Sequence, residues 1–241
     1  MIIKINIRSI YKMCFNERVS ILAYLAGMSG SSVLWNMNRK PEALFFGWAT
    51  QMQLIEYFLW QNQPCQLEEK EKKVCEDSSI VLCNDTNKTI SKIGLFVNNL
   101  EPLILFAGIQ MYSPLRLPLF MIVMVCIFII FNFVHTVDVI QRSENNDKEG
   151  CTLVTEESYP HLFWKWNQGS FAGIFYLSFV LIIAMLSYYG VPDGYLLSFT
   201  STIGFLTSHY IYRDKKSTGS MWCLMGAFTP WILAGIYWMH E

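Results

Sequence analysis

Residues 117–137 read LPLFMIVMVCIFIIFNFVHTV and contain no Asp, Glu, Lys or Arg. An α-helix needs about 20 mainly apolar residues to cross the hydrocarbon core of a bilayer. This stretch has that length and composition, and residues 171–190, FAGIFYLSFVLIIAMLSYYG, repeat the pattern. Both stretches therefore predict transmembrane helices.

Five weaker stretches on either side of these two have a similar length and an apolar bias. Because a backbone inside lipid must satisfy its own hydrogen bonds, helices are the expected structure. The predicted fold class is an all-α integral membrane bundle of seven transmembrane helices, and residues 1–241 form one domain. The predicted spans are Val19–Met37, Glu42–Trp60, Lys92–Tyr112, Leu117–Val137, Ser170–Tyr189, Gly194–Tyr212 and Ser220–Met239.

The composition agrees with a bilayer as the main partner. Of the 241 residues 53% are hydrophobic and 15% are charged, whereas a soluble domain carries roughly 25% charged residues. The net charge of −1 excludes a basic field for nucleic acid, and the high hydrophobicity excludes disorder. The sequence predicts no cofactor, and it neither requires nor excludes an oligomer.

Alternating spans place the N-terminus and the polar loops 63–91 and 138–169 on one side of the membrane, which we call the long-loop face. Residues 1–18 are interpreted as an amphipathic or flexible leader on that face. The opposite face has three short connections, each marked by proline, which disfavours helix at the residue before it.

Two sets of signals disagree about which compartment the long-loop face meets. All but three of the 18 Lys and Arg lie on it, and the positive-inside rule then predicts the cytoplasm. Against this, Asn84 and Asn87 begin N-glycosylation acceptors. The polar loops also hold Cys65, Cys75, Cys83 and Cys151. An even set of cysteines suits disulfides in an oxidising compartment.

Glycosylation and disulfides together favour a lumenal or extracellular long-loop face. They predict residence in a secretory-pathway, plasma or viral membrane.

The second predicted span carries a polar and aromatic stripe. Gln53, Glu56 and Tyr57 fall on one face of a helix, and Trp60 extends it by a turn. An ionisable group inside a span is costly and by default indicates function.

The third predicted span places Asn98 and Glu101 one turn apart, directly before Pro102. Proline removes a backbone hydrogen bond and often kinks a helix, which leaves a carbonyl exposed. With Gln53, Glu56 and Tyr57, these residues predict a site for an ion, a small molecule or a lipid. The alternative is that they only form hydrogen bonds that fix helix packing.

Histidines near the long-loop face are weaker candidates. His135 and Asp138 lie one turn apart, so the carboxylate could orient the imidazole as in hydrolytic or metal sites. His161 and His209 come up on the same face, but no characteristic zinc-ligand spacing joins the three histidines. Ordinary interfacial histidines are therefore the favoured reading. The aromatic and basic segment 161–166 resembles a headgroup-level anchor.

Several short motifs, each present once, are spread in order along almost the whole chain. They are Met13-Cys14-Phe15-Asn16-Glu17-Arg18-Val19-Ser20, Arg39-Lys40-Pro41, Gln53 with Glu56 and Trp60, Glu101-Pro102, His161 with Trp164, and Ser220 with Trp222 and Cys223. The set resembles a family of uncharacterised multi-pass membrane proteins from bacteria, large DNA viruses and algae. Asn16 stands where that family has serine, and loop 63–91 has no counterpart in it.

The resemblance implies an outside N-terminus and singles out Cys14, Gln53, Glu56, Trp60, Trp222 and Cys223 without giving them roles. Cys14 and Cys223 could pair, or pack as small hydrophobic residues. Three functions stay open at this point: a bundle that binds or transports a ligand, a structural or assembly protein, and a membrane-embedded lipid hydrolase.

Overall fold

A computed structural model describes residues 16–63, 84–145, 150–154, 161–167, 171–212 and 217–240. The chain is mostly helical, as the sequence predicts. The helices are α2 (Glu17–Asn36), α3 (Lys40–Ala49), α4 (Gln51–Gln61), α5 (Asp85–Tyr112), α6 (Leu119–Asn145), α7 (Ala172–Gly190), α8 (Tyr195–Tyr212) and α9 (Thr218–His240).

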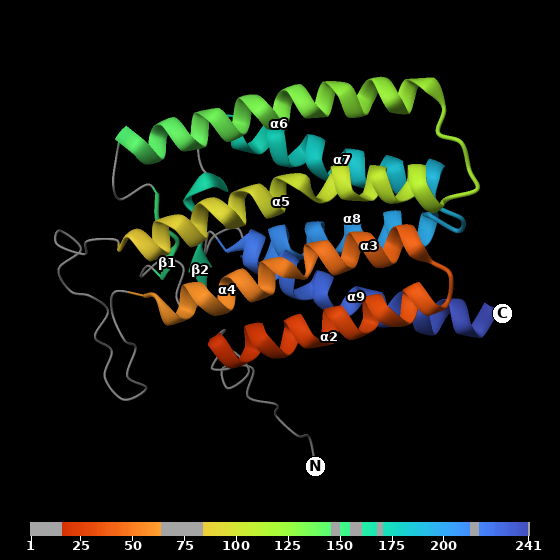
Figure 1. Cartoon of the computed structure of the whole chain (residues 1–241), viewed down its shortest axis with the longest axis horizontal. Helices are drawn as coiled ribbons and strands as arrows, with labels where there is room; N and C mark the ends of the chain where they lie inside the picture. Colours follow the sequence, from red (N-terminus) through yellow and green to blue (C-terminus); the bar gives the residue numbers. More distant parts are fainter. Residues whose placement is uncertain are drawn as a thin grey trace, which may run out of the picture.

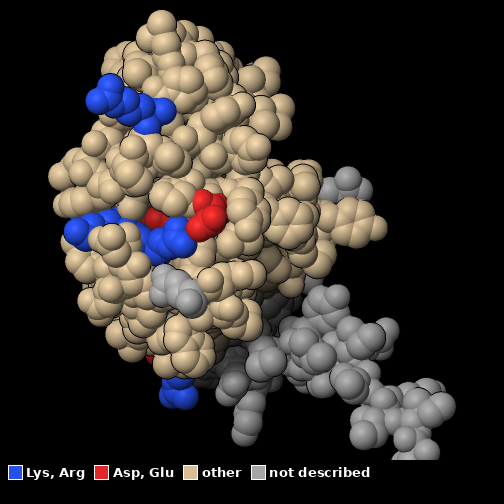
Figure 2. All heavy atoms as spheres, turned by 90° about the vertical axis from the view of Figure 1, so that its right-hand side faces the viewer, with Lys and Arg blue, Asp and Glu red and all other residues tan. Residues whose placement is uncertain are grey.

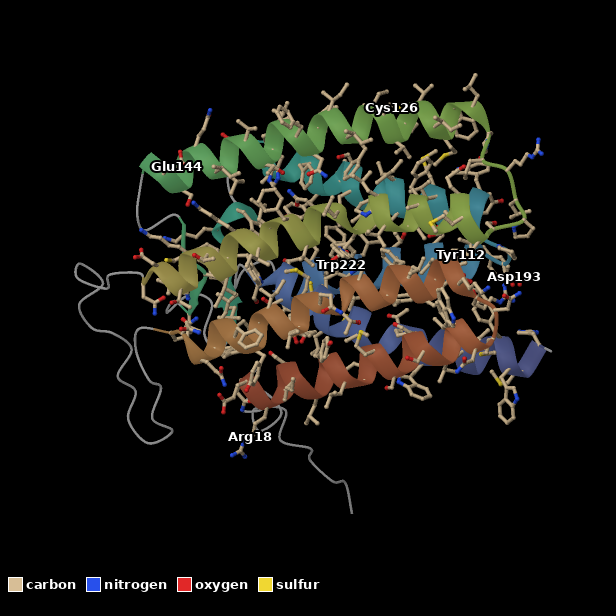
Figure 3. All side chains as sticks on the ribbon, in the orientation of Figure 1. Arg18, Tyr112, Cys126, Glu144, Asp193 and Trp222 are labelled. Carbon is tan, nitrogen blue, oxygen red and sulfur yellow. The ribbon has the colours of Figure 1, made fainter. Side chains whose placement is uncertain are left out.

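Four of the described helices, α5, α6, α7 and α9, are long and apolar enough to cross a membrane. The outer side of α6 carries large apolar side chains over its length, with Leu119 76% exposed and Phe133 69% exposed. Cys126 lies on the same outward side (Figure 3). An apolar surface of this extent needs lipid around it, so the chain is a membrane protein.

The helices lie side by side, and α3 and α4 follow one another in one direction while the other successive helices run in opposite directions (Figure 1). Helix α2 packs on α3, α4 and α9, while α8 contacts α7 and α9. Helix α5 packs on α3, α4, α6 and α7. One end of the bundle holds the short connections, and the other holds strands β1 (Leu153–Val154) and β2 (Leu162–Phe163), which pair antiparallel.

Two clusters of buried side chains form the interior. The larger one joins α3, α5, α6, α7 and α9 around Phe175 and Phe179, which are fully buried. The second lies near the long-loop face, where Leu162 and Trp164 pack on Met52 and Leu95. Residues 162–166 of the segment between α6 and α7 are therefore part of the bundle interior.

Three predicted boundaries were wrong. The second span is divided at Thr50 into α3 and α4, where the Thr50 side chain fills the space beside Gly27 of α2. Helix α6 continues past Val137 to Asn145, and the ion pair of Asp138 with Arg142 at 2.9 Å stabilises the added turns. Helix α5 begins at Asp85, capped by the side chain of Asn84.

At the short-connection end, the side chain of Arg39 contacts several elements. Arg39 forms an ion pair with Asp193 at 2.9 Å, donates to the Pro192 carbonyl at 3.0 Å and stacks on the ring of Tyr237. Figure 2 looks onto this end and shows a few charged side chains on an otherwise uncharged surface. These contacts tie α3 and α9 to the turn between α7 and α8.

Candidate functional site

Glu56 is a buried carboxyl surrounded by hydrogen-bond donors. It is 1% exposed. Gln53 Nε2 donates to Glu56 Oε2 at 3.2 Å, and Trp164 Nε1 donates to Glu56 Oε1 at 3.3 Å. The same indole N–H lies 3.0 Å from Ser220 Oγ, whose hydroxyl donates to the Leu162 carbonyl. These bonds join α4, α9 and the segment before α7, which makes Glu56 a structural centre.

Trp164 reaches Glu56 because the segment 161–167 folds into the bundle. Trp164 and Trp166 are buried and stack with their ring centroids 4.3 Å apart. Both rings lie against Gly94 of α5, where an added Cβ would stand 2.9 Å from Trp166. The prediction of a headgroup-level anchor for this segment was wrong, because Gly94 leaves room for both indoles inside the bundle.

The two neighbouring amides of α5, Asn98 and Asn99, have different surroundings. Asn99 contacts α6, donating to Thr136 Oγ1 at 3.0 Å, and its carbonyl accepts from Asn132 Nδ2 at 2.8 Å. Asn98 donates to Asn99 Oδ1 and also lines a cavity. Asn99 therefore fixes helix packing, while Asn98 stands at a boundary with open space.

The cavity that Asn98 lines has a volume of about 520 Å³. It lies between α7, α8, α9 and the segment 161–167. The walls are mainly aromatic and apolar: Phe163, Trp164, Trp166, Tyr176, Phe205 and Trp222. The described polar groups at its edge include His209 and Thr218. Figure 3 shows Trp222 between the helices, far from both ends of the bundle.

Glu101 lines a second, smaller cavity of about 40 Å³ between α3, α5, α8 and α9. It is 4% exposed. Within the described ranges no hydrogen-bond donor or cation contacts its carboxyl. Trp222 and Cys223 line both cavities, so one turn of α9 separates Glu101 from the larger space.

The predicted cluster of Gln53, Glu56, Tyr57, Asn98 and Glu101 does not form a single site. Gln53 and Glu56 belong to the hydrogen-bonded network, and Asn98 and Glu101 line the two cavities. Tyr57 lies at the surface, where its hydroxyl accepts from Gln61 Nε2 at 2.8 Å.

The pairing of His135 with Asp138, which the sequence offered as a weak candidate, is not formed. The Asp138 carboxylate is taken by Arg142, one turn further along α6. His135 instead points inward and is fully buried, stacked on Phe175 at a centroid distance of 4.0 Å. Spacing by one turn allowed the pair, but the two side chains turn toward different environments.

The three histidines also fail to converge as a metal site. His161 is buried against Tyr212, whereas His209 is exposed and stacks on Phe205. In the part of the chain that the structure describes, no three His, Cys, Asp or Glu side chains form a metal-binding group. The zinc arrangement weighed for His135, His161 and His209 is therefore not formed.

The predicted disulfide cysteines are only partly described by the structure. Cys151 is buried and disulfide-bonded, while Cys14, Cys65, Cys75 and Cys83 lie outside the described residues, so the pairing scheme stays a prediction. Cys223 is a free thiol, which removes its pairing with Cys14.

The two glycosylation candidates also differ. Asn87 is fully buried, and its Nδ2 donates to the carbonyls of Asn62 and Thr152. This packing leaves no room for a glycan there. Asn84 caps α5 and is exposed, so its glycosylation stays a prediction.

Sequence reasoning missed the side chains that complete the site. Trp164 and Ser220 were noted only as parts of motifs. In the structure, the Trp164 N–H is shared between Ser220 Oγ and Glu56 Oε1, which joins segments far apart in the chain. Thr200, Ser201 and Thr229 beside Glu101 look in the sequence like ordinary helix-packing residues. A comparison of the chain with protein-family models, curated proteins and solved structures finds no match.

Proposed function

We propose that the chain crosses the membrane seven times and binds a lipid-like amphiphile in the 520 Å³ cavity. Helices α2 and α8 would add crossings to the four long apolar helices, and α3 with α4 would form one broken crossing. Their packing supports this assignment, because α2 lies along α9 and α8 lies between α7 and α9.

The observation that carries the proposal is the size and chemistry of this cavity. Ligand pockets commonly have about 300–1,000 Å³ and an apolar lining with a few polar groups. Tryptophan, tyrosine and phenylalanine rings suit an apolar chain or ring system, while Asn98 and His209 could hold a polar head. A small hydrated ion would leave most of these aromatic walls unused.

Access from the bilayer supports a lipid-like ligand. Gly173 and Leu177 line the cavity on α7 and are exposed, as is His209 on α8. The cavity therefore reaches the outer surface between α7 and α8. A ligand dissolved in the membrane could enter there without passing through water.

Filling the cavity mouth tests this proposal. Gly173→Phe adds a large ring at a position where a new Cβ has nothing within 4 Å, so the fold should tolerate it. The matched control is Gly235→Phe on α9, which is equally open but does not line the cavity. The probe is a photoactivatable single-chain lysophospholipid added to the protein in lipid nanodiscs.

We expect the probe to label α7 and α8 in the wild type and in Gly235→Phe. Gly173→Phe should lower that labelling roughly tenfold, equivalent to about 1.4 kcal/mol of binding free energy. Equal labelling of the two variants would contradict the proposal.

A structural role without a ligand is the second candidate. The hydrogen bonds of Glu56 favour it, since they join three parts of the bundle and each oxygen of that carboxyl accepts from a protein donor. In this case Gly173→Phe would leave both the labelling and the in vivo function of the protein unchanged.

The orientation that we propose places the long-loop face in the lumen or outside the cell. The disulfide of Cys151 supports it, because disulfides persist in oxidising compartments. Expression in eukaryotic cells should give a glycosidase-sensitive mass shift that Asn84→Gln abolishes. Retention of the shift in that variant would argue against Asn84 as the acceptor.

A further inference from the structure

The small cavity beside Glu101 presents oxygen atoms from three helices. Glu101 comes from α5, Thr200 and Ser201 come from α8, and Thr229 comes from α9. The volume of about 40 Å³ exceeds the roughly 10–15 Å³ that one water-sized occupant requires. The cavity therefore has room for a small ion with a water molecule.

The hydroxyl groups on this wall are oriented to accept. Thr200 Oγ1 donates to the Leu196 carbonyl at 2.8 Å, and Thr229 Oγ1 donates to the Met225 carbonyl at 3.0 Å. Each of these two hydroxyls uses its one O–H to donate a hydrogen bond within its own helix. Its lone pairs remain available, and lone pairs are what a cation needs.

A backbone carbonyl adds to the set. Pro230 lies inside α9 and has no N–H, so the carbonyl of Gly226, four residues earlier, lacks its helical donor. Gly226 lines the same cavity, and because glycine has no side chain its backbone atoms form that part of the wall. Proline-freed carbonyls inside membranes are tolerated where they are satisfied by neighbours or face a cavity.

The charge count decides the class of ion. Glu101 is the only acidic residue among the described residues that line the cavity, and none of the described residues donates to its carboxyl. A monovalent cation would make the site neutral, whereas a divalent cation would leave one charge uncompensated in a buried place.

We propose that this cavity binds one monovalent cation, with Na⁺ as the test ion, between the Glu101 carboxylate, the Gly226 carbonyl and the hydroxyls of α8 and α9. The site lies apart from the amphiphile cavity except for their common wall of Trp222 and Cys223. The proposal does not depend on the amphiphile, and each can fail while the other holds.

Equilibrium binding of radioactive Na⁺ to the full chain in lipid nanodiscs tests it, with choline chloride keeping the ionic strength constant. We expect saturable binding of one Na⁺ per chain. Glu101→Gln keeps the shape and should lower the affinity roughly 30-fold or more, as for a buried charge that loses its partner. Ser201→Ala should lower it roughly tenfold, because bonds to charged groups are strong ones.

Two control variants separate the site from general effects. Glu144→Gln changes an exposed carboxyl at the end of α6 and should bind Na⁺ like the wild type. Gly173→Phe should also keep Na⁺ binding while losing the lysophospholipid, which distinguishes failure of this site from failure of the amphiphile cavity.

Thermal melting in NaCl against choline chloride gives a second readout, because a bound ion stabilises the folded state. The proposal is overturned if the wild type shows no saturable Na⁺ binding, or if folded Glu101→Gln binds Na⁺ with unchanged affinity.

Discussion

Glu56 and Glu101 are both acidic residues buried in the bundle, but they have opposite surroundings. Glu56 accepts hydrogen bonds from Gln53 and Trp164 and lies in a closed network. Glu101 has no donor among the described residues and faces a cavity. One carboxyl therefore joins parts of the fold, while the other has oxygen lone pairs that no donor among the described residues uses.

This comparison qualifies the rule that an ionisable group inside a membrane span marks a functional site. A carboxyl with protein donors on both oxygens is explained by packing. A carboxyl that lines open space without a donor is not, and only the second kind needs a ligand, an ion or a proton to explain it.

The largest expected effect is on stability when each carboxyl is removed. Glu56→Leu leaves the buried Gln53 amide N–H without its acceptor and leaves the Trp164 N–H only Ser220 Oγ. It should lower the free energy of unfolding by about 3 kcal/mol. Glu101→Leu removes a carboxyl without partners and should change it by less than about 1 kcal/mol. Reversible unfolding by SDS in mixed micelles measures both, and equal losses would erase the distinction.

The next effect tests whether the tryptophans hold Glu56 in place. Gly94→Ala brings a methyl group within 2.9 Å of Trp166 and 3.1 Å of Trp164. It should cost about 2 kcal/mol by overpacking. Gly235→Ala, which meets nothing within 4 Å, is the control and should be neutral or slightly stabilising. If both alanines behave alike, the close packing around Trp164 is not a source of stability.

Much of the fold follows from the sequence because hydrophobic length and proline breaks act locally. Residues 117–137 and 171–190 could hardly be anything but helices in lipid. The turns before Pro41 and at Pro192 fall where proline predicts them. The break at Thr50 was not predictable, since no proline or glycine stands at that position, where the Thr50 side chain packs beside Gly27 of another helix.

For the candidate site, the sequence predicted the pairs of residues on one helix but not the contacts between distant segments. Spacing brought Gln53 to Glu56, and Asn98 near Glu101, because each pair lies on one turn of a helix. Trp164 and Ser220 reach Glu56 from far along the chain, and no local pattern encodes such contacts. The same limit explains Asp138, whose choice between His135 and Arg142 depends on which side of α6 faces the interior.

The smallest effect distinguishes two buried serines. Ser220→Ala removes the hydroxyl that lies 3.0 Å from Trp164 Nε1 and should lower the free energy of unfolding by about 1 kcal/mol. Ser201→Ala, beside Glu101, should leave it nearly unchanged in the absence of Na⁺. Thermal melting of both variants in choline chloride checks this, and a larger loss for Ser201→Ala would reverse the assignment.

A high-resolution cryo-electron microscopy map of the protein in lipid nanodiscs containing NaCl tests the contrast between the two carboxyls most directly. The account predicts a discrete density enclosed by Glu101, Ser201 and Gly226, and at Glu56 only the side chains of Gln53 and Trp164. A map in which Glu101 accepts a hydrogen bond from a protein donor, with its cavity closed, would contradict it.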